Sequence, residues 1–285
     1  MDYNVIQDIE TILELRDLSV ADLAKELEIS RITLNNWIDG KTAISHSNVE
    51  RLYKYAFDSG IRLNKIKEQF YREESKPRSE HILFHGSKNG INGHIKLSVG
   101  EKYSDFGSGF YCGESLEQSV MFVSSYPNSS LYILRFNHSG LKKKEYSVSR
   151  EWMIMIAYFR GIIDSKNKIE IIEKELKQLE SVDYIVAPIA DNRMFEIIDQ
   201  FIAGEITDVQ CKHCLSATNL GMQYVFRTKK ALNKIEILER CFLTEVEKRM
   251  YLKERHDNYE MNRDKVKLAR RNYRNKGKYI EEILK

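Results

Sequence analysis

Apolar residues recur at helical spacing four times within the first seventy or so positions of the chain. The four segments are Val5–Leu15, Val20–Leu27, Ile32–Ile38 and Val49–Phe57. Ser19 and Ser30 stand directly ahead of the second and third segments, where serine is favoured as a helix N-cap. Gly40 follows the third segment, at a position suited to a left-handed C-cap. The pattern predicts an all-helical domain over residues 1–72.

The pattern changes after residue 80. Residues 73–80 are charged and aperiodic and include Pro77, so we interpret them as a linker. Short segments rich in β-branched and aromatic residues then predict strands at Ile82–Phe84, Leu131–Phe136, Val182–Ile189 and Tyr224–Phe226. Helical spacing lies between them, at Leu116–Val123, Glu151–Ile162, Lys168–Leu179, Met194–Ile202 and Lys229–Ile237. This mixture predicts an α+β domain over residues 81–237, followed by a charged helical tail over residues 238–285.

Composition adds two constraints. The 285 residues contain four cysteines, no apolar run as long as a membrane span and no leader-like start, which favours a cytoplasmic protein that neither enters nor anchors to a membrane. The net charge is only +3, but Arg263–Lys278 carries eight basic residues against the single acid Asp264. Such asymmetry indicates an anionic partner for the tail, DNA or RNA.

Two segments of the middle domain carry the candidate chemistry. Leu83–Ser87 is an apolar strand that ends in histidine, glycine and serine, where a ligand can approach the backbone closely. Asp105–Tyr111 places two glycines before an aromatic pair, and Ser115 then precedes a helix that carries Ser119 and Phe122.

In order and spacing these segments resemble the first two signatures of the poly(ADP-ribose) polymerase and diphtheria-toxin branch of ADP-ribosyltransferases. The resemblance covers about residues 82–227 and implies a mixed-sheet ADP-ribosyltransferase fold. It is closer still to a bacterial offshoot that includes toxins of toxin–antitoxin and phage-defence systems. That offshoot shares the Asp-Phe-Gly-x-Gly-Phe-Tyr run, the later Pro188–Arg193 run and the segment Gln223–Leu232.

The resemblance implies that NAD is the substrate and that no metal is needed. It assigns NAD binding to His85, Gly86, Ser87, Phe110, Tyr111, Ser119 and Phe122. His85 would bond a ribose hydroxyl, the Gly86 backbone would pair with the nicotinamide amide, and Ser87 would lie near the adenosine. Tyr111 would stack on the nicotinamide ring. Phe122 takes the place of the second stacking ring, and Ser119 that of a hydroxyl that bonds the carboxamide.

The third signature departs from the enzyme pattern. The polymerase-like enzymes have a glutamate where this chain has Gln223, which can accept or donate a hydrogen bond but brings no charge. With His85 and Tyr111 as its catalytic partners, Gln223 favours transfer of a single ADP-ribose over chain elongation. Asp191, Glu196 and the target itself are candidates to activate the acceptor.

Asp191 and Arg193 directly follow the strand predicted at Val182–Ile189, so their side chains are expected at the cleft. The alternative is that Asp191 or Asn192 caps a helix.

Leu18–Ala56 resembles a helix-turn-helix of the phage-repressor type. This implies a recognition helix whose groove-facing candidates are Arg31, Thr33, Asn35 and Asn36. The region lacks a strong basic patch, so a repressor-like fold used for dimerisation or sensing is the alternative.

Two further features have competing interpretations. The basic tail offers Tyr273 for base stacking, or it is a solvated helix face. Cys211 and Cys214 resemble half of a zinc site, but no second pair stands at suitable spacing, which favours a helical turn with half-buried thiols.

The sequence thus predicts a mono-ADP-ribosyltransferase that acts on a nucleic acid or a protein as a bacterial toxin or phage-defence effector, with an antitoxin protein as a partner. Two alternatives stay open. One is a DNA-binding regulator whose middle domain binds NAD or ADP-ribose without transfer. The other is an NAD glycohydrolase.

Overall fold

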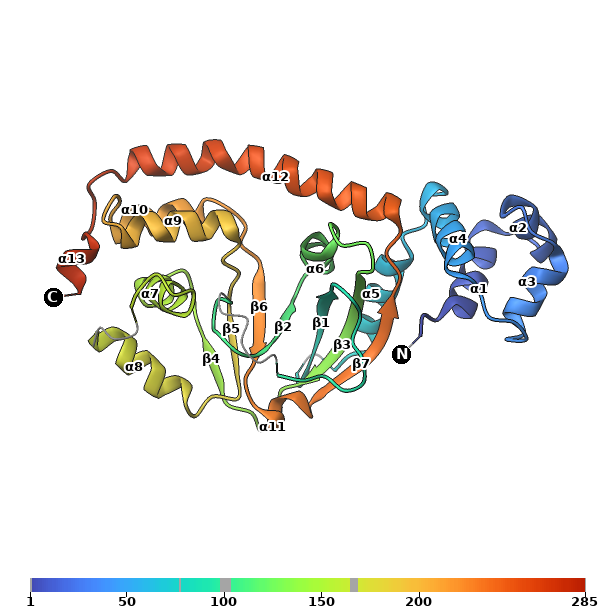
Figure 1. Cartoon of the computed structure of the whole chain (residues 1–285), viewed down its shortest axis with the longest axis horizontal. Coiled ribbons are helices and arrows are strands. Elements are labelled where there is room, and N and C mark those ends of the chain that lie inside the picture. Colours follow the sequence, from blue (N-terminus) through green and yellow to red (C-terminus); the bar gives the residue numbers. More distant parts are fainter. Residues whose placement is uncertain (1, 77, 98–103, 165–168, 285) are drawn as a thin grey trace. The chain divides into compact units, whose positions relative to one another are not determined.

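A computed structural model describes residues 2–76, 78–97, 104–164 and 169–284 (Figure 1). The chain divides into two compact units, each built from segments that are distant in sequence. The first unit contains Met1–Gly90, Leu116–Arg135 and Glu236–Lys253. The second contains Ile91–Ser115, Phe136–Ile235 and Glu254–Lys285.

The first unit begins with five helices; the periodicity predicts the first four, and the fifth extends two residues into the predicted linker. They are α1 (Val5–Arg16), α2 (Val20–Glu26), α3 (Arg31–Ile38), α4 (His46–Asp58) and α5 (Leu63–Glu74). The predicted caps are confirmed: Ser19 Oγ accepts from the backbone N–H of Asp22, and Ser30 Oγ from that of Thr33. Gly40 follows the C-cap of α3 with φ +65°, the left-handed conformation that glycine adopts without strain.

The core of these five helices includes a side chain from far along the chain. Phe242 is buried among them, with its ring centroid 5.2 Å from that of Tyr3 and 5.1 Å from that of Tyr53. Asn64 Nδ2 donates to the Phe242 carbonyl oxygen at 3.0 Å. The N-terminal helices therefore depend on residue 242 to complete their apolar core.

A buried ion cluster reinforces this junction. Lys67 Nζ lies 2.7 Å from the Asp8 carboxylate on α1 and 2.6 Å from the Glu239 carboxylate. Tyr53 donates its hydroxyl hydrogen to Asp8. Burial alone would lower the pKa of Lys67, but the carboxylates of Asp8 and Glu239 outweigh it and hold that pKa above its ordinary value.

Three strands complete the first unit, in the order β1 (Glu80–Ser87), β3 (Ser130–Asn137) and β7 (Ile235–Cys241). Helix α6 (Leu116–Val123) packs on β1. Their shared core contains Phe84, Val120, Ile133 and Cys241, which places the predicted histidine–glycine–serine strand end against a helix.

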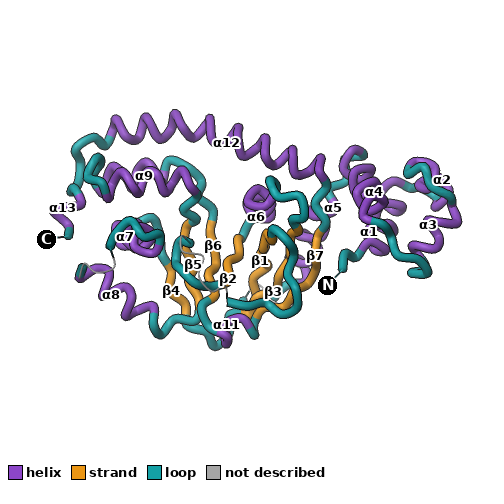
Figure 2. The backbone as a smooth tube through the Cα atoms, in the orientation of Figure 1, coloured by secondary structure: helices purple, strands orange, loops and turns teal. Residues whose placement is uncertain are grey.

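The second unit holds four strands in the order β4 (Lys143–Glu145), β5 (Tyr184–Pro188), β6 (Met222–Phe226) and β2 (Phe110–Gly113) (Figure 2). β4 and β5 are parallel, whereas β5 with β6 and β6 with β2 are antiparallel, so this part of the sheet is mixed, as expected.

The helices of the second unit are α7 (Arg150–Phe159), α8 (Glu170–Leu179), α9 (Asn192–Ile202), α10 (Asp208–Ser216), α11 (Lys229–Leu232), the second half of α12 (Glu245–Asn272), and α13 (Ile280–Ile283). Except for α11, these helices share one core with β5 and with Val225 of β6.

Two expectations were wrong near the end of the middle domain. The predicted helix at Lys229–Ile237 stops at Leu232, and Ile235 begins strand β7. The helical tail consequently starts at Glu245 and not near Leu238. Apolar residues at 231, 232, 235 and 238 fit a helical period as well as they fit a strand, so local spacing did not separate the two.

Within the described ranges, none of the helices combines the length and the apolar character that a membrane crossing requires.

We predict that Lys67→Met strongly destabilises the protein, because it leaves the buried carboxylates of Asp8 and Glu239 without their shared cation. Losing one partner of a buried charge cluster costs about 3–5 kcal/mol. The free energy of unfolding, measured by urea titration, checks this. Lys54→Met is the control, because Lys54 pairs with Asp58 on the surface and its loss should cost less than about 1 kcal/mol. Equal effects of the two changes would contradict the prediction.

Candidate functional site

The predicted NAD-binding residues of the first unit lie on β1 and α6. His85, Gly86 and Ser87 form the half-buried end of β1. A Cβ atom on Gly86 would lie 2.5 Å from the Ser119 carbonyl oxygen and 2.8 Å from Val123 Cγ1. Glycine is therefore required here to admit α6, a reason that sequence inspection missed when it considered only the approach of a ligand.

The two α6 side chains assigned by the resemblance differ in exposure. Ser119 is buried, and its hydroxyl donates to the Phe84 carbonyl oxygen at 3.3 Å, which ties α6 to β1. Phe122 is 54% exposed and is free of the core. The His85 ring lies beside Tyr132, with centroids 6.5 Å apart.

In the second unit, the glycines of the Asp105–Tyr111 run have steric roles. Gly107 has φ +70°, and a Cβ there would lie 3.1 Å from Phe159 Cδ1. A Cβ on Gly109 would lie 2.8 Å from Val225 Cγ1 and 3.0 Å from the Phe226 carbonyl oxygen. Both glycines allow this turn to fold tightly against its neighbours.

Tyr111 is held by the turn that precedes it. Its hydroxyl accepts a hydrogen bond from the Phe106 N–H at 3.1 Å and donates to the Gly107 carbonyl oxygen at 2.7 Å. Burial raises the pKa of the hydroxyl well above its ordinary value, so it stays protonated. The ring orientation is thereby fixed. Phe110 points to the opposite face, where it is buried with its ring centroid 6.3 Å from that of Phe226.

The strand register places Tyr111 and Gln223 on one face of the sheet. Tyr111 is paired with Val225, and Gly113 is paired with Gln223. Directly paired residues of antiparallel strands project to the same face, and so do residues two apart on one strand. The Tyr111 ring and the Gln223 amide therefore project from the same side of the sheet, where the paired Val225 is fully buried in the core of the second unit.

The orientation of the Gln223 amide is set by its neighbours. Gln223 Nε2 donates to Asp105 Oδ2 at 2.6 Å and to the Pro188 carbonyl oxygen at 3.0 Å. A carboxylate and a carbonyl only accept hydrogen bonds, so the nitrogen must face them. Gln223 is buried, and among the described residues its Oε1 accepts no hydrogen bond, so this oxygen keeps its acceptor capacity.

Asp105 is a buried residue beside Gln223 to which the sequence assigned no role. Its Oδ1 accepts from Arg160 Nε at 2.9 Å and from Arg160 Nη2 at 2.5 Å, and its Oδ2 accepts from the Ala190 N–H at 2.9 Å. Arg160 also lies 4.3 Å from the centre of the Phe195 ring. Asp105 opens the Asp105–Tyr111 run, but nothing in the sequence links it to Gln223, 118 positions later.

The candidate accessory residues have structural contacts. Asp191 is the N-cap of α9 and accepts from the Met194 N–H at 2.9 Å, as the helix-cap interpretation proposed. Arg193 donates to the Tyr259 carbonyl oxygen at 2.9 Å and lies 5.0 Å from the centre of its ring. Glu196 is exposed on α9.

The DNA-binding candidates lie on α3. Arg31 is exposed, and Asn35 and Asn36 are half-buried. The Thr33 hydroxyl is engaged with Ser30 Oγ at 2.8 Å, as part of the helix start. Ile32, the first residue of the predicted apolar segment Ile32–Ile38, is 73% exposed and lies outside the core.

Tyr273 of the tail contacts α10 of the second unit, the helix that also carries Cys211 and Cys214. The Tyr273 ring is stacked on His213, with centroids 3.5 Å apart and an interplanar angle of 8°, so one of its faces already has a partner. Cys211 and Cys214 lie on α10 and are fully buried, more than the predicted half. Their thiols face the carbonyl oxygens of Ile197 and Val266 at 3.6 and 3.7 Å.

We predict that Gln223→Glu, although it restores the residue type of the polymerase-like enzymes, lowers stability at pH 8. The new carboxylate would face that of Asp105 where a hydrogen bond now stands. Repulsion raises the pKa of the pair, so the loss of stability shrinks as the pH falls and one proton is bound. Thermal melting at pH 5 and pH 8 measures this. In the control Asp105→Asn/Gln223→Glu the pH-dependent loss should disappear. Unchanged melting of Gln223→Glu at pH 8 would refute the proposed contact.

Comparison with known proteins gives one match. The sequence model of a family described as "Protein of unknown function (DUF3990)" matches residues 81–237, which is more than half of the chain. No curated protein and no solved structure matches. The chain therefore belongs to the DUF3990 family of proteins of unknown function.

Proposed function

We propose that this protein is an NAD-dependent mono-ADP-ribosyltransferase. The observation that carries the proposal is the shared face of Tyr111 and Gln223, with Gln223 Oε1 presented as an acceptor. The resemblance implies that Tyr111 stacks on nicotinamide while residue 223 holds a ribose hydroxyl. Both roles need a fixed ring and an acceptor on one face, and the second unit supplies both.

The reaction breaks the bond between nicotinamide and the anomeric carbon of the ribose. The bonding electrons leave with nicotinamide, and the acceptor atom forms the new bond as it releases a proton. The ribose carbon passes through an oxocarbenium-like state, as in glycoside hydrolysis. Gln223 Oε1 would orient the ribose by accepting from a hydroxyl, and the ring of Tyr111 would hold the leaving group.

The charge at this face is close to balanced. Asp105 polarises the Gln223 amide through a 2.6 Å hydrogen bond, but Arg160 neutralises most of its charge. The developing cation would therefore be stabilised less than by a free carboxylate. This favours transfer of one ADP-ribose to a reactive acceptor and disfavours chain elongation.

The rest of the NAD site follows from the resemblance. His85, Gly86, Ser87, Ser119 and Phe122 would contribute to NAD binding. The acceptor would be a nucleic acid or a protein. Such an activity suits a bacterial toxin or phage-defence effector that acts in the cytoplasm and is held in check by an antitoxin protein.

Water as the acceptor would make the protein an NAD glycohydrolase instead. Tyr111 and Gln223 do not favour water over a macromolecule as the acceptor, because both residues would act on NAD itself.

DNA binding by the N-terminal helices is a second proposed function. Arg31 and Ile32 stand exposed in the first turn of α3, where a recognition helix contacts base edges. An isoleucine that is 73% exposed is suited to contact with thymine methyl groups. DNA binding with NAD binding but without turnover would make the protein a regulator.

The transferase prediction is tested with NAD labelled in the adenylate part. Purified wild-type protein should attach label to a macromolecule of a cell lysate and release an equal amount of nicotinamide. Gln223→Ala and Tyr111→Ala should each lower the rate of both about 100-fold, the effect of losing one well-placed transition-state contact. Gln178→Ala, an exposed glutamine on α8, is the control.

Each other outcome identifies an alternative. Release of nicotinamide without labelled product would indicate a glycohydrolase. NAD binding measured by calorimetry without release would indicate a sensor. The absence of both NAD binding and nicotinamide release would end the proposal.

The DNA proposal predicts that the full chain selects a specific duplex from a random pool. Changing Arg31 and Asn35 together to alanine should weaken that binding by about tenfold or more, since each base contact contributes about 1–3 kcal/mol. An electrophoretic shift with the full chain measures this, because residues 1–72 lack Phe242 of their core. Arg16→Ala, at the end of α1, is the control. Failure to select any sequence would leave dimerisation or sensing as the role of this fold.

A further inference from the structure

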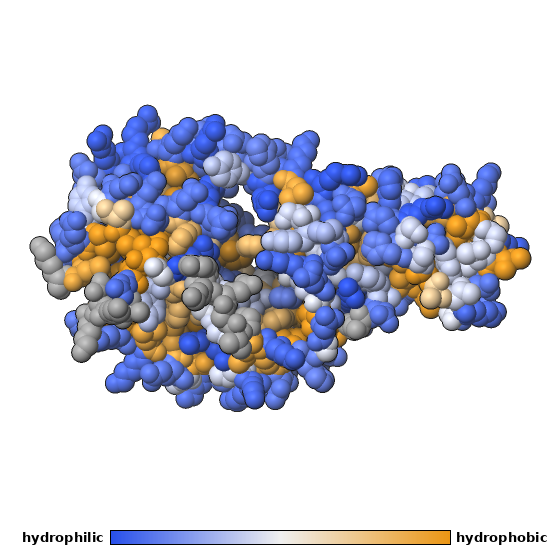
Figure 3. Space-filling model, in the orientation of Figure 1, coloured by the Kyte–Doolittle hydropathy of each residue, from blue (hydrophilic) through white to orange (hydrophobic). Residues whose placement is uncertain are grey.

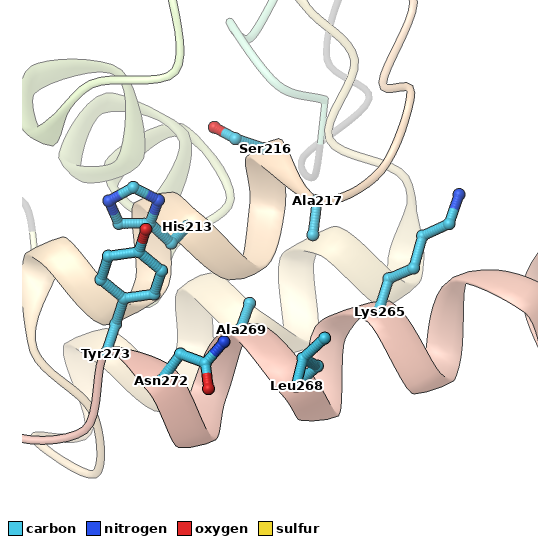
Figure 4. A pocket seen from close by; sticks show the side chains of 8 residues that line it. All are labelled: His213, Ser216, Ala217, Lys265, Leu268, Ala269, Asn272 and Tyr273. Atoms are coloured by element: carbon cyan, nitrogen blue, oxygen red, sulfur yellow. The ribbon is translucent and has the colours of Figure 1, made fainter.

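An open groove of the second unit lies between α10 and α12. Its volume is about 330 Å³, and its lining includes His213, Ser216, Lys265, Leu268, Asn272 and Tyr273 (Figure 4). None of the residues assigned to NAD lines it. The groove is therefore a candidate site for a different ligand.

The stacked rings of His213 and Tyr273 stand together at one end of the groove (Figure 4). The backbone around them is fixed: Thr207 Oγ1 donates to the Lys276 carbonyl oxygen, and Gln210 Nε2 donates to that of Arg270 at 2.6 Å. A fixed, nearly parallel pair of rings is a platform that a further planar ring can extend. Lys276 Nζ lies over the Tyr273 ring, 5.0 Å from its centre, so a cation already contacts the Tyr273 side of the platform.

Lys265 stands at the other end of the groove, with the amide of Asn272 and the apolar Leu268 between it and the rings (Figure 4). This order of groups offers a cation for a phosphate, an amide for hydrogen bonds and an aromatic surface for a base.

The part of helix α12 that belongs to the second unit packs against that unit through one face. Val266 and Ala269 pack into the core of the second unit, and the side chains over this part of α12 are mostly hydrophilic (Figure 3). Arg263 and Lys267 pair with the surface acids Glu260 and Asp264. By contrast, within the described ranges no ion pair is recorded for Lys265, Arg271, Arg274, Lys276 or Lys278.

These cations follow one another in sequence along the end of α12 and the segment after it. Because they have no acidic partners among the described residues, their charge is available to phosphates. An acidic peptide would meet the cations but would leave the ring platform unused. We propose that the α10–α12 groove and the adjoining basic segment bind single-stranded nucleic acid, with a base stacked on the His213–Tyr273 pair. This binding does not depend on ADP-ribosyl transfer.

The test uses the full chain without NAD and fluorescein-labelled 15-nucleotide RNA and DNA strands in 50 mM and 200 mM salt. Anisotropy should show binding that weakens with salt. Arg271→Glu with Arg274→Glu should lower the affinity about tenfold or more, because two phosphate contacts are lost. Tyr273→Leu should lower it about fivefold or more, the effect of one lost base stack.

Two matched controls accompany these variants. Lys229→Glu reverses the charge of an exposed lysine on α11, outside the groove, and should leave strand binding unchanged. Asn35→Ala with Asn36→Ala tests whether the strand binds at α3 instead. Circular dichroism melting confirms that each variant is folded.

Three results would overturn the proposal. The first is no binding of either strand in 50 mM salt. The second is binding that survives the Arg271 and Arg274 changes but is lost with the Asn35 and Asn36 changes. The third is equal displacement by poly-glutamate together with no effect of Tyr273→Leu, which would assign the groove to an acidic protein partner. A preference between RNA and DNA would identify which strand is bound.

Discussion

The buried carboxylate of Asp105 joins four segments of the second unit. It accepts hydrogen bonds from Arg160 at the end of α7, from the Ala190 backbone after β5 and from Gln223 on β6, while its own segment leads into β2. A buried carboxylate is stable only when it is paired and fully hydrogen-bonded, so each of these partners must be in place. The hydrogen bond from Gln223 Nε2 to Asp105 also sets the orientation of the Gln223 amide in the candidate site, because it turns the nitrogen toward Asp105.

The contact with Asp105 changes how the glutamine at position 223 is interpreted. From the sequence alone, Gln223 is a neutral residue at a position where the resemblance leads us to expect a glutamate. In its surroundings it is an amide whose nitrogen is held by a carboxylate and a carbonyl oxygen. The arrangement keeps the acceptor and gives up most of the charge, which fits a proposed enzyme that needs orientation more than a strong electrostatic field.

The first unit depends on a comparable junction. Phe242 fills the core of the N-terminal helices, and Lys67 bridges Asp8 on α1 and Glu239 on β7. A helical region that lacked one core ring and one partner of its buried cation would be weakened on both counts. The N-terminal helices thus share their core and their buried charges with β7 and with Phe242, the residue directly after β7.

The sequence by itself determined much of the local structure. Helical spacing and serine caps located α1–α4, β-branched runs located β1, β3, β5 and β6, and the glycine-rich motifs marked the segments that bend tightly. Such features depend on residues within a few positions of one another. Only the tertiary structure showed that residue 235 begins a strand. It also brought Asp105 to Gln223 and Phe242 to the N-terminal core. Finally, it stacked Tyr273 on His213. These contacts join residues that are tens to hundreds of positions apart, and no local propensity encodes them, because the stabilising partner exists only once the chain has folded.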